Sequence, residues 1–154
     1  MEVYDYRKIY KNLYRGNPQL IEIVEVPSLH YVVTKGKGQR NVYSIHEGEG
    51  LWSLSRVVNR LKDMSKNNSQ KKFNLMPLVI IWSKVETEAS DWTWTAYMQL
   101  PEFITSDMFT QALLELERRN RNVKVPVRLE IYDQQLAVQA THLGPYNQIN
   151  ETYK

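Results

Sequence analysis

The sequence predicts an α+β fold in which helices cover one side of an antiparallel sheet. Segments with alternating or branched apolar residues are interleaved with two segments of helical periodicity. The resulting order of strands and helices is too mixed for a β-sandwich. Strands that follow one another after short turns also argue against a purely parallel sheet.

The first segments along the chain are an N-terminal arm and two strands. Residues 1–19 are polar and aromatic and end in Gly16-Asn17-Pro18, which indicates an arm or short helix leading into a turn. Residues 20–26 are rich in branched side chains and stop at a proline, as strands do. Residues 29–34 are a second predicted strand, and residues 35–41 are predicted to be a flexible loop.

Residues 51–62 form the first predicted helix. Its apolar residues recur at helical spacing and make one stripe: Leu51, Leu54, Val58 and Leu61. A polar loop is expected at residues 63–72. It is followed by a strand at residues 74–82, where Pro77 indicates an edge position or a bulge.

Residues 92–99 show the clearest alternation in the chain. One face of this strand is predicted to carry Trp92, Trp94, Ala96 and Met98, and the other face Thr93, Thr95, Tyr97 and Gln99. A second helix is predicted to begin at Thr105 or Ser106, with a hydroxyl cap and Asp107 in its first turn. Its buried side is predicted to hold Phe109, Ala112, Leu113 and Leu116. Residues 127–132 and 136–142 are predicted to pair as a hairpin.

The composition fits one globular domain and excludes several kinds of chemistry. Of 154 residues, 42% are hydrophobic and 24% are charged. The absence of cysteine excludes disulfides, cysteine-ligated zinc, iron–sulfur clusters and a thiol nucleophile. The charged start does not resemble a secretory signal, and no run of about 18 apolar residues occurs. These features predict a cytoplasmic protein with no membrane partner.

The charge distribution predicts no nucleic-acid partner. The net charge is +3, and the basic excess lies in residues 1–72, with 13 Lys and Arg against 7 Asp and Glu. A nucleic-acid-binding protein concentrates such an excess on one helix or stripe. Here the basic residues are spread over the predicted tails and loops, where solvated charge is the simpler explanation.

Aromatic residues are the candidates for a binding site. The set that we single out contains Trp52, Trp82, Trp94, Tyr97 and Tyr146. Aromatic faces stack on flat ligands and attract cations, with each desolvated contact contributing about 0.5–2 kcal/mol. The alternative is that these side chains pack in the core or across strands, as tryptophan at alternate strand positions often does.

The histidines and carboxylates predict neither a metal site nor an evident catalytic group. The three histidines are 16 and 96 residues apart, so they lack metal-ligand spacing, and we expect no metal and no cofactor. His142 is a candidate polar contact for a ligand or a structural hydrogen-bonding residue. Glu22, Glu102 and Glu130 are candidate acids only by their presence. Glu130 alternates with apolar neighbours and is expected on the solvent face of its strand.

Eight segments carry a resemblance to a known family: Ile21 to Pro27, the Gly36-Lys37-Gly38 segment, Leu51 to Ser55, Met76-Pro77-Leu78, Trp92 to Thr95, Gln99 to Thr105, Val127 to Glu130, and His142 to Tyr146. In this order and spacing, over residues 20–146, they resemble the GyrI-like small-molecule-binding family. The resemblance implies residues 1–19 as an arm and residues 20–154 as the binding domain. It also implies two strand–helix–strand–strand modules with a ligand between them, the second module incomplete.

Three functions follow from the resemblance. The first is binding of hydrophobic, aromatic or cationic small molecules in drug or toxin response, with the aromatic set and His142 lining the groove. The second is a hydrolase that opens cyclopropane-containing genotoxins. The family's C-terminal glutamate motif does not occur in this sequence, and its middle-strand acidic position is Val79 here. The third is a protein-interaction or gyrase-inhibitor-like module, with a homodimer formed through an exposed sheet edge.

Overall fold

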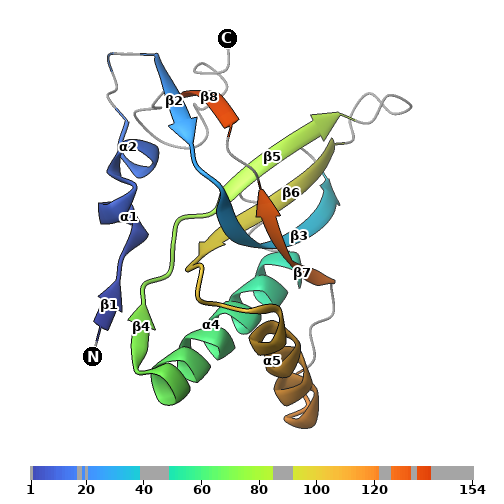
Figure 1. Cartoon of the computed structure of the whole chain (residues 1–154). Helices are drawn as coiled ribbons and strands as arrows, with labels where there is room; N and C mark the ends of the chain where they lie inside the picture. Colours follow the sequence, from blue (N-terminus) through green and yellow to red (C-terminus); the bar gives the residue numbers. More distant parts are fainter. Residues whose placement is uncertain are drawn as a thin grey trace.

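The centre of the protein is a four-stranded antiparallel sheet with two helices on one side, which confirms the predicted α+β class. The computed structural model describes residues 2–16, 19, 21–38, 49–84, 92–121, 126–132 and 135–139. The sheet has the order β5–β6–β3–β7 (Figure 1). Its strands are β3 (Leu29–Gly38), β5 (Val79–Lys84), β6 (Trp92–Leu100) and β7 (Val127–Tyr132). The helices are α4 (Glu49–Ser69) and α5 (Ser106–Arg118), which lie below the sheet in Figure 1.

Two smaller strand pairs and a short helical segment complete the described part of the chain. The N-terminal strand β1 (Glu2–Tyr4) pairs in parallel with β4 (Lys71–Phe73). Strand β2 (Glu22–Val26) pairs antiparallel with β8 (Gln135–Gln139), above the sheet in Figure 1. The short helices α1 (Tyr6–Ile9) and α2 (Lys11–Tyr14) connect β1 to β2 along one side.

The alternation predicted for residues 92–99 is present in β6. Trp94, Ala96 and Met98 are buried beneath the helices, whereas Thr95 and Tyr97 on the opposite face are half-buried. Register carries the pattern across the sheet, because Val32 of β3 lies opposite both Met98 and Leu129. One face of the sheet is therefore apolar and the other is not.

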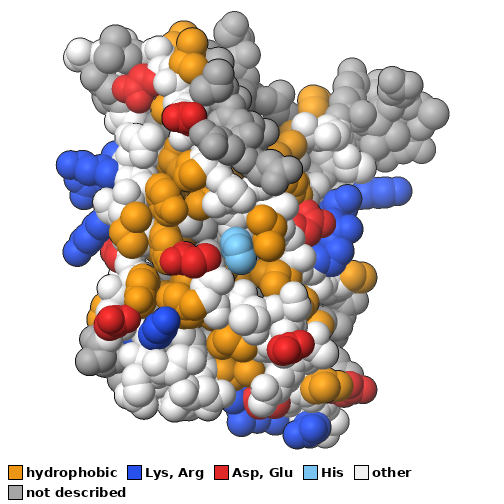
Figure 2. Space-filling view, in the orientation of Figure 1, with side chains coloured by type: hydrophobic (Ala, Val, Ile, Leu, Met, Phe, Trp, Pro, Cys, Tyr) orange, Lys and Arg blue, Asp and Glu red, His pale blue; other side chains and the backbone are white. Residues whose placement is uncertain are grey.

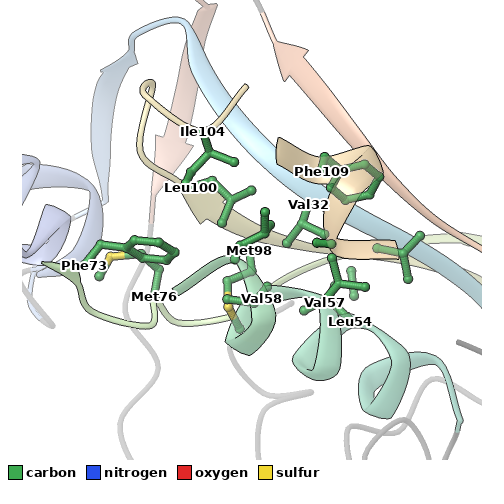
Figure 3. Packing of buried hydrophobic residues seen from close by; sticks show 14 of the residues in the cluster. Val32, Leu54, Val57, Val58, Phe73, Met76, Met98, Leu100, Ile104 and Phe109 are labelled. Carbon is green, nitrogen blue, oxygen red and sulfur yellow. The ribbon is translucent and has the colours of Figure 1, made fainter. Parts of the chain in front are cut away.

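The core lies between this apolar face and the two helices (Figure 3). The stripe of α4 is fully buried at Leu54, Val57, Val58 and Leu61. Helix α5 contributes Phe109, Ala112 and Leu116, as its spacing predicts, while Leu113 is partly buried against the same cluster. Thr105 caps α5, and its side-chain oxygen accepts a hydrogen bond from the Met108 backbone N–H at 3.2 Å.

The predicted loop at residues 35–41 is wrong for its first half, because β3 continues to Gly38. The glycines there serve close packing. A Cβ added at Gly36 would lie 2.2 Å from Cζ2 of Trp94, and one at Gly50 would lie 2.8 Å from Cη2 of the same ring. The missing side chains let the Trp94 indole fit against the backbone of β3 and the start of α4.

Three further boundaries differ from prediction. Helix α4 runs on to Ser69 through the predicted polar loop, because Met64 and Ser65 remain on its buried side. The strand predicted from residue 74 begins at Val79 instead. The predicted hairpin of residues 127–142 is also wrong within the described residues, since β7 pairs with β3 and β8 pairs with β2.

Candidate ligand-binding surface

The sheet face turned away from α4 and α5 carries a cluster of tyrosines. We call this surface the tyrosine face and define it by Tyr31, Tyr97, Gln99, Glu130 and Tyr132. The strand register brings these residues together, because Tyr31 of β3 lies opposite Gln99 of β6 on one side and Glu130 of β7 on the other. Tyr97 is two residues from Gln99 on β6, and Tyr132 is two residues from Glu130 on β7. Both tyrosines therefore point to the same face as these residues.

The three tyrosine rings form a mutual edge-to-face triangle. The ring centroids of Tyr31 and Tyr97 are 5.8 Å apart, those of Tyr31 and Tyr132 are 5.7 Å apart, and those of Tyr97 and Tyr132 are 5.3 Å apart. The interplanar angles are 79°, 68° and 71°, respectively. This arrangement brings positive ring edges onto negative ring faces. It holds three rigid aromatic groups in one place.

The hydroxyl groups of this triangle are connected to a carboxylate. The Tyr132 hydroxyl is hydrogen-bonded to Glu130 Oε2, and the hydroxyl oxygens of Tyr132 and Tyr97 lie 3.1 Å apart. A hydroxyl has one proton, and an ionised carboxylate only accepts. We therefore assign the Tyr132 proton to Glu130 and the Tyr97 proton to the bond between the two hydroxyls, which makes a chain from Tyr97 through Tyr132 to Glu130.

Glu130 is also paired with a cation at the margin of the tyrosine face. Its Oε1 lies 2.8 Å from Nη2 of Arg128, and the exposed side-chain fractions are 28% for Glu130 and 51% for Arg128. Glu130 thus lies on the strand face expected from its alternation with Leu129, and its side chain is only partly exposed there. The side chain is half-buried, because Tyr132 covers one of its oxygens and Arg128 pairs with the other.

Burial raises the pKa of two tyrosines of this face, Tyr31 and Tyr132. Desolvation raises the pKa of Tyr132 well above its usual range, and the hydrogen bond to Glu130 raises it further. Desolvation also raises the pKa of Tyr31. At neutral pH the tyrosine face therefore presents neutral hydroxyl groups that can donate hydrogen bonds.

The structure divides the aromatic residues that the sequence singled out between different surfaces. Trp82 and Trp94 lie directly opposite each other in the β5–β6 register, on the helix-covered side. Trp52 is 60% exposed on α4, where the Arg56 guanidinium lies 4.6 Å from its ring centroid. Tyr97 alone is on the tyrosine face. His142 and Tyr146 lie outside the described residues.

The sequence reasoning did not select Tyr31 or Tyr132 for the site, and it named Glu130 as a candidate acid only by its presence. Each was placed in a predicted strand, and their spacing of two residues within β7 already indicates that Glu130 and Tyr132 share a face. What the sequence could not supply is the pairing of β7 with β3, which joins segments about 100 residues apart. Residue type alone did not separate these tyrosines from the others.

The other acidic candidates and the histidines do not form a metal site in the described part of the chain, where no group of three or more potential ligands is found. Glu102 accepts a hydrogen bond of 2.6 Å from the Tyr6 hydroxyl, which lowers the pKa of its carboxyl. His30 has a buried Nδ1 without a hydrogen-bond partner.

On the face of the molecule that Figure 2 shows, hydrophobic side chains gather beside the N-terminal arm. Within the described residues, no helix is long and apolar enough to cross a bilayer.

The fold and the tyrosine face define an α+β domain with an aromatic, partly polar surface on the sheet face turned away from α4 and α5. No protein-family model matches the sequence, and no curated protein matches it. Three structures from Listeria innocua share the fold. An uncharacterized conserved protein has a TM-score of 0.81 at 21% identity, over 97% of this chain and 76% of its own.

Two Listeria innocua proteins described as hydrolases are similar as well. One has a TM-score of 0.78 at 24% identity, over 97% of this chain and 75% of its own. The other has a TM-score of 0.79 at 22% identity, over 99% of this chain and 77% of its own. At these identities the likeness establishes the fold and no more.

Proposed function

We propose that the tyrosine face binds a flat aromatic or cationic small molecule, as the resemblance to the GyrI-like family implies. The observation that supports this proposal is the triangle of Tyr31, Tyr97 and Tyr132 beside the Glu130 carboxylate. Rigid rings with polar tips supply contact area at little cost in conformational entropy. The function is binding in drug or toxin response, with the helix-covered face as its scaffold.

The charges beside the rings favour ligands with a delocalised positive charge. A cation above a tyrosine ring gains about 0.5–2 kcal/mol, depending on how far it is desolvated. Glu130 adds a negative charge, but Arg128 already neutralises part of it. Because half of the Arg128 side chain is exposed, it can move aside at small cost. A cationic ligand would then replace the guanidinium as the partner of Glu130.

The proposal is tested by calorimetric titration of the full chain with rhodamine 6G and tetraphenylphosphonium. Tyr97→Ala should weaken binding at least tenfold, because it removes one of the three rings of the triangle. Trp52→Ala is the matched control, since it removes an exposed ring from α4 and should change affinity less than twofold. Arg128→Gln should strengthen binding of both cations. Equal affinities for the wild type and Tyr97→Ala would reject the tyrosine face as the site.

The second candidate is hydrolysis of a strained-ring alkylating compound. Its specific support is the hydrogen-bonded chain from Tyr97 through Tyr132 to Glu130, together with the two hydrolases of the same fold. A neutral tyrosine can donate a proton to the carbon or heteroatom whose bond breaks as the strained ring of the substrate opens. The Glu130 carboxylate at the other end of the chain can accept the proton that the attacking water loses, and that proton can return through Tyr132 to reprotonate Tyr97.

This candidate is tested by incubating the protein with a cyclopropane-bearing alkylating compound and following ring opening by mass spectrometry. The expected product is heavier by one water. Glu130→Gln should abolish turnover while leaving binding of the compound within a few-fold of wild type. Turnover that survives in Glu130→Gln would remove this carboxylate from the reaction. Binding without turnover in the wild type would leave the first function standing alone.

A further inference from the structure

The N-terminal arm is attached to the domain at several separate points. We use the name for residues 2–14, which include β1, α1 and α2. The Asn74 backbone N–H donates to the Tyr4 carbonyl at 3.0 Å, and the Asn74 side-chain amide donates to Asp5 Oδ2 at 3.1 Å. The Tyr6 side chain is 3% exposed. These contacts belong to a built part of the fold, since they join the arm to β4 and to the residue that follows it.

Aromatic stacking stiffens the arm along its length. The ring centroids of Tyr4 and Tyr6 are 6.4 Å apart, and those of Tyr6 and Tyr10 are 5.8 Å apart, with interplanar angles of 19° and 15°. Phe103 packs its edge against Tyr4 at 5.0 Å. The arm thus carries its last residue, Tyr14, to a defined position beside the sheet.

Tyr14 meets the domain on the tyrosine face. Its hydroxyl donates a hydrogen bond to Oε1 of Gln99, whose side chain is almost completely buried. Gln99 is two residues from Tyr97 on β6 and lies opposite Tyr31 of β3. The end of the arm therefore reaches the same patch of sheet as the tyrosine triangle, from a position 85 residues away in the sequence.

We propose that Tyr14 is a specificity-determining residue of the ligand site, and that the arm is held in place as a side wall of that site. This inference rests on the proposed binding function and identifies a part of the site that lies outside the sheet. The buried amide oxygen of Gln99 has no access to water as a replacement partner. Loss of the Tyr14 hydroxyl leaves that oxygen unsatisfied, which is costly, and frees the ring to move.

The electrostatics of Tyr14 agree with this position. Burial raises the pKa of Tyr14, and the neighbouring Tyr31 raises it further. The hydroxyl therefore stays protonated and remains a donor to Gln99 at neutral pH. A bound ligand would meet the Tyr14 ring and not its hydroxyl, so the wall is apolar toward the site. Flat hydrophobic cations suit such a wall better than strongly hydrated ones.

The test is a calorimetric titration of the full chain with tetraphenylphosphonium and rhodamine 6G, using three arm variants. Tyr14→Phe should weaken binding about fivefold, the equivalent of one net hydrogen bond. Tyr14→Ala should weaken binding more than tenfold, because the wall itself is removed. Tyr4→Phe is the matched control. It also removes one tyrosine hydroxyl from the arm, but that hydroxyl is bonded to Glu2 within the arm, so affinity should stay within twofold.

Hydrogen exchange distinguishes a wall of the site from a merely structural contact. Saturating ligand should slow exchange of backbone amides at residues 11–15 and leave those of α5 unchanged. If the wild type binds and Tyr14→Ala binds equally well, the inference is wrong and the binding function stands. If the wild type binds neither probe, the binding function is wrong and the inference falls with it. Circular dichroism confirms that each variant is folded.

Discussion

The two faces of the four-stranded sheet are made by alternate residues of the same strands, yet they differ in nearly every chemical respect. On the helix-covered face, Val32, Ala96 and Leu100 are buried and apolar and make only packing contacts. On the tyrosine face, the same strands carry rings with hydroxyl tips, an amide and a carboxylate. The described side chains of the first face are mostly apolar, although the Thr34 hydroxyl donates a hydrogen bond to the Pro126 carbonyl, whereas the second face carries several hydrogen-bonded side chains.

This difference separates the face that supplies most of the buried apolar area from the face on which we propose the function. An apolar face against two helices gives stability through buried area, at about 25 cal/mol per Å². Half-buried tyrosines joined to Glu130 cost desolvation that an aliphatic surface would avoid. Local features that reduce stability without an evident structural gain are expected at functional sites. This contrast supports the proposal that ligands bind on the tyrosine face.

The largest expected effect comes from a truncation in the helix-covered layer. Leu54→Ala removes a fully buried side chain from α4 and should destabilise the protein by about 3 kcal/mol, through lost burial and the cavity left behind. Urea denaturation followed by circular dichroism measures the free energy of unfolding. Leu114→Ala on α5, where the side chain is 47% exposed, is the control and should cost less than about 1 kcal/mol. Equal losses would remove the contrast between core and surface.

A smaller effect is expected from overfilling the same layer. Gly36→Ala places a methyl group against the Trp94 indole, at a distance that real structures do not tolerate. The ring or the strand must shift, which should cost about 1–3 kcal/mol. Thermal unfolding measures the loss, and near-ultraviolet circular dichroism reports the displaced tryptophan. Combining the change with Trp94→Phe, which replaces the indole with a smaller ring, should recover part of the stability. A fully additive double variant would show that the two residues do not interact.

On the tyrosine face, a substitution should affect ligand binding more than stability. Tyr132→Phe keeps the ring triangle and removes the hydroxyl between Tyr97 and Glu130, so unfolding should be easier by about 1 kcal/mol. Binding of tetraphenylphosphonium should change severalfold, because Glu130 loses a hydrogen-bond partner beside the ligand. Urea denaturation and calorimetry on the same sample give both numbers. A loss of several kcal/mol would show that this face contributes to stability as the core does.

The sequence predicted the helix-covered face far better than the tyrosine face, for a physical reason. Burial between the sheet and the helices imposes a periodic pattern of apolar residues within each element. The alternation of residues 92–99 and the stripe from Leu51 to Leu61 could therefore be predicted from the sequence. The buried positions Phe109, Ala112 and Leu116 of α5 were confirmed for the same reason. Each depends on the period of one element and not on its neighbours.

The tyrosine face depends on contacts between distant segments. Tyr97 was selected from the pattern of its own strand. Its partners Tyr31 and Tyr132 lie on β3 and β7, and the pairing of β3 with β6 and with β7 cannot be predicted from a local pattern. The predicted hairpin of residues 127–142 failed in the same way, because β8 found its partner in β2. Trp94 was selected by residue type, and the structure places it in the core cluster, 6% exposed, with its ring against Gly36 and Gly50.

The smallest effect on stability at neutral pH is expected from the ionisation of the tyrosines. A pH titration distinguishes the two faces by their ionisable groups. Burial raises the pKa of Tyr14, Tyr31 and Tyr132, so their folded-state pKa lies above the unfolded value of about 10. The stability that these groups contribute is fully present below about pH 10 and is lost as the pH rises toward the raised values. Tyr6 of the core cluster adds to this dependence in the same sense, because burial raises its pKa, whereas the aliphatic packing residues do not ionise.

Absorbance at the tyrosinate band measures this directly. Of the ten tyrosines in the sequence, exposed ones should ionise near pH 10, whereas Tyr6, Tyr14, Tyr31 and Tyr132, whose pKa burial raises, should remain protonated until the fold opens at higher pH. In concentrated urea all ten should ionise together, which provides the reference. Tyr132→Phe should remove one tyrosine from the late group and leave the early group unchanged. A single transition of all ten in the folded protein would mean that the tyrosine face is as open to water as the surface, and the shielded ring cluster proposed as the ligand site would not exist in solution.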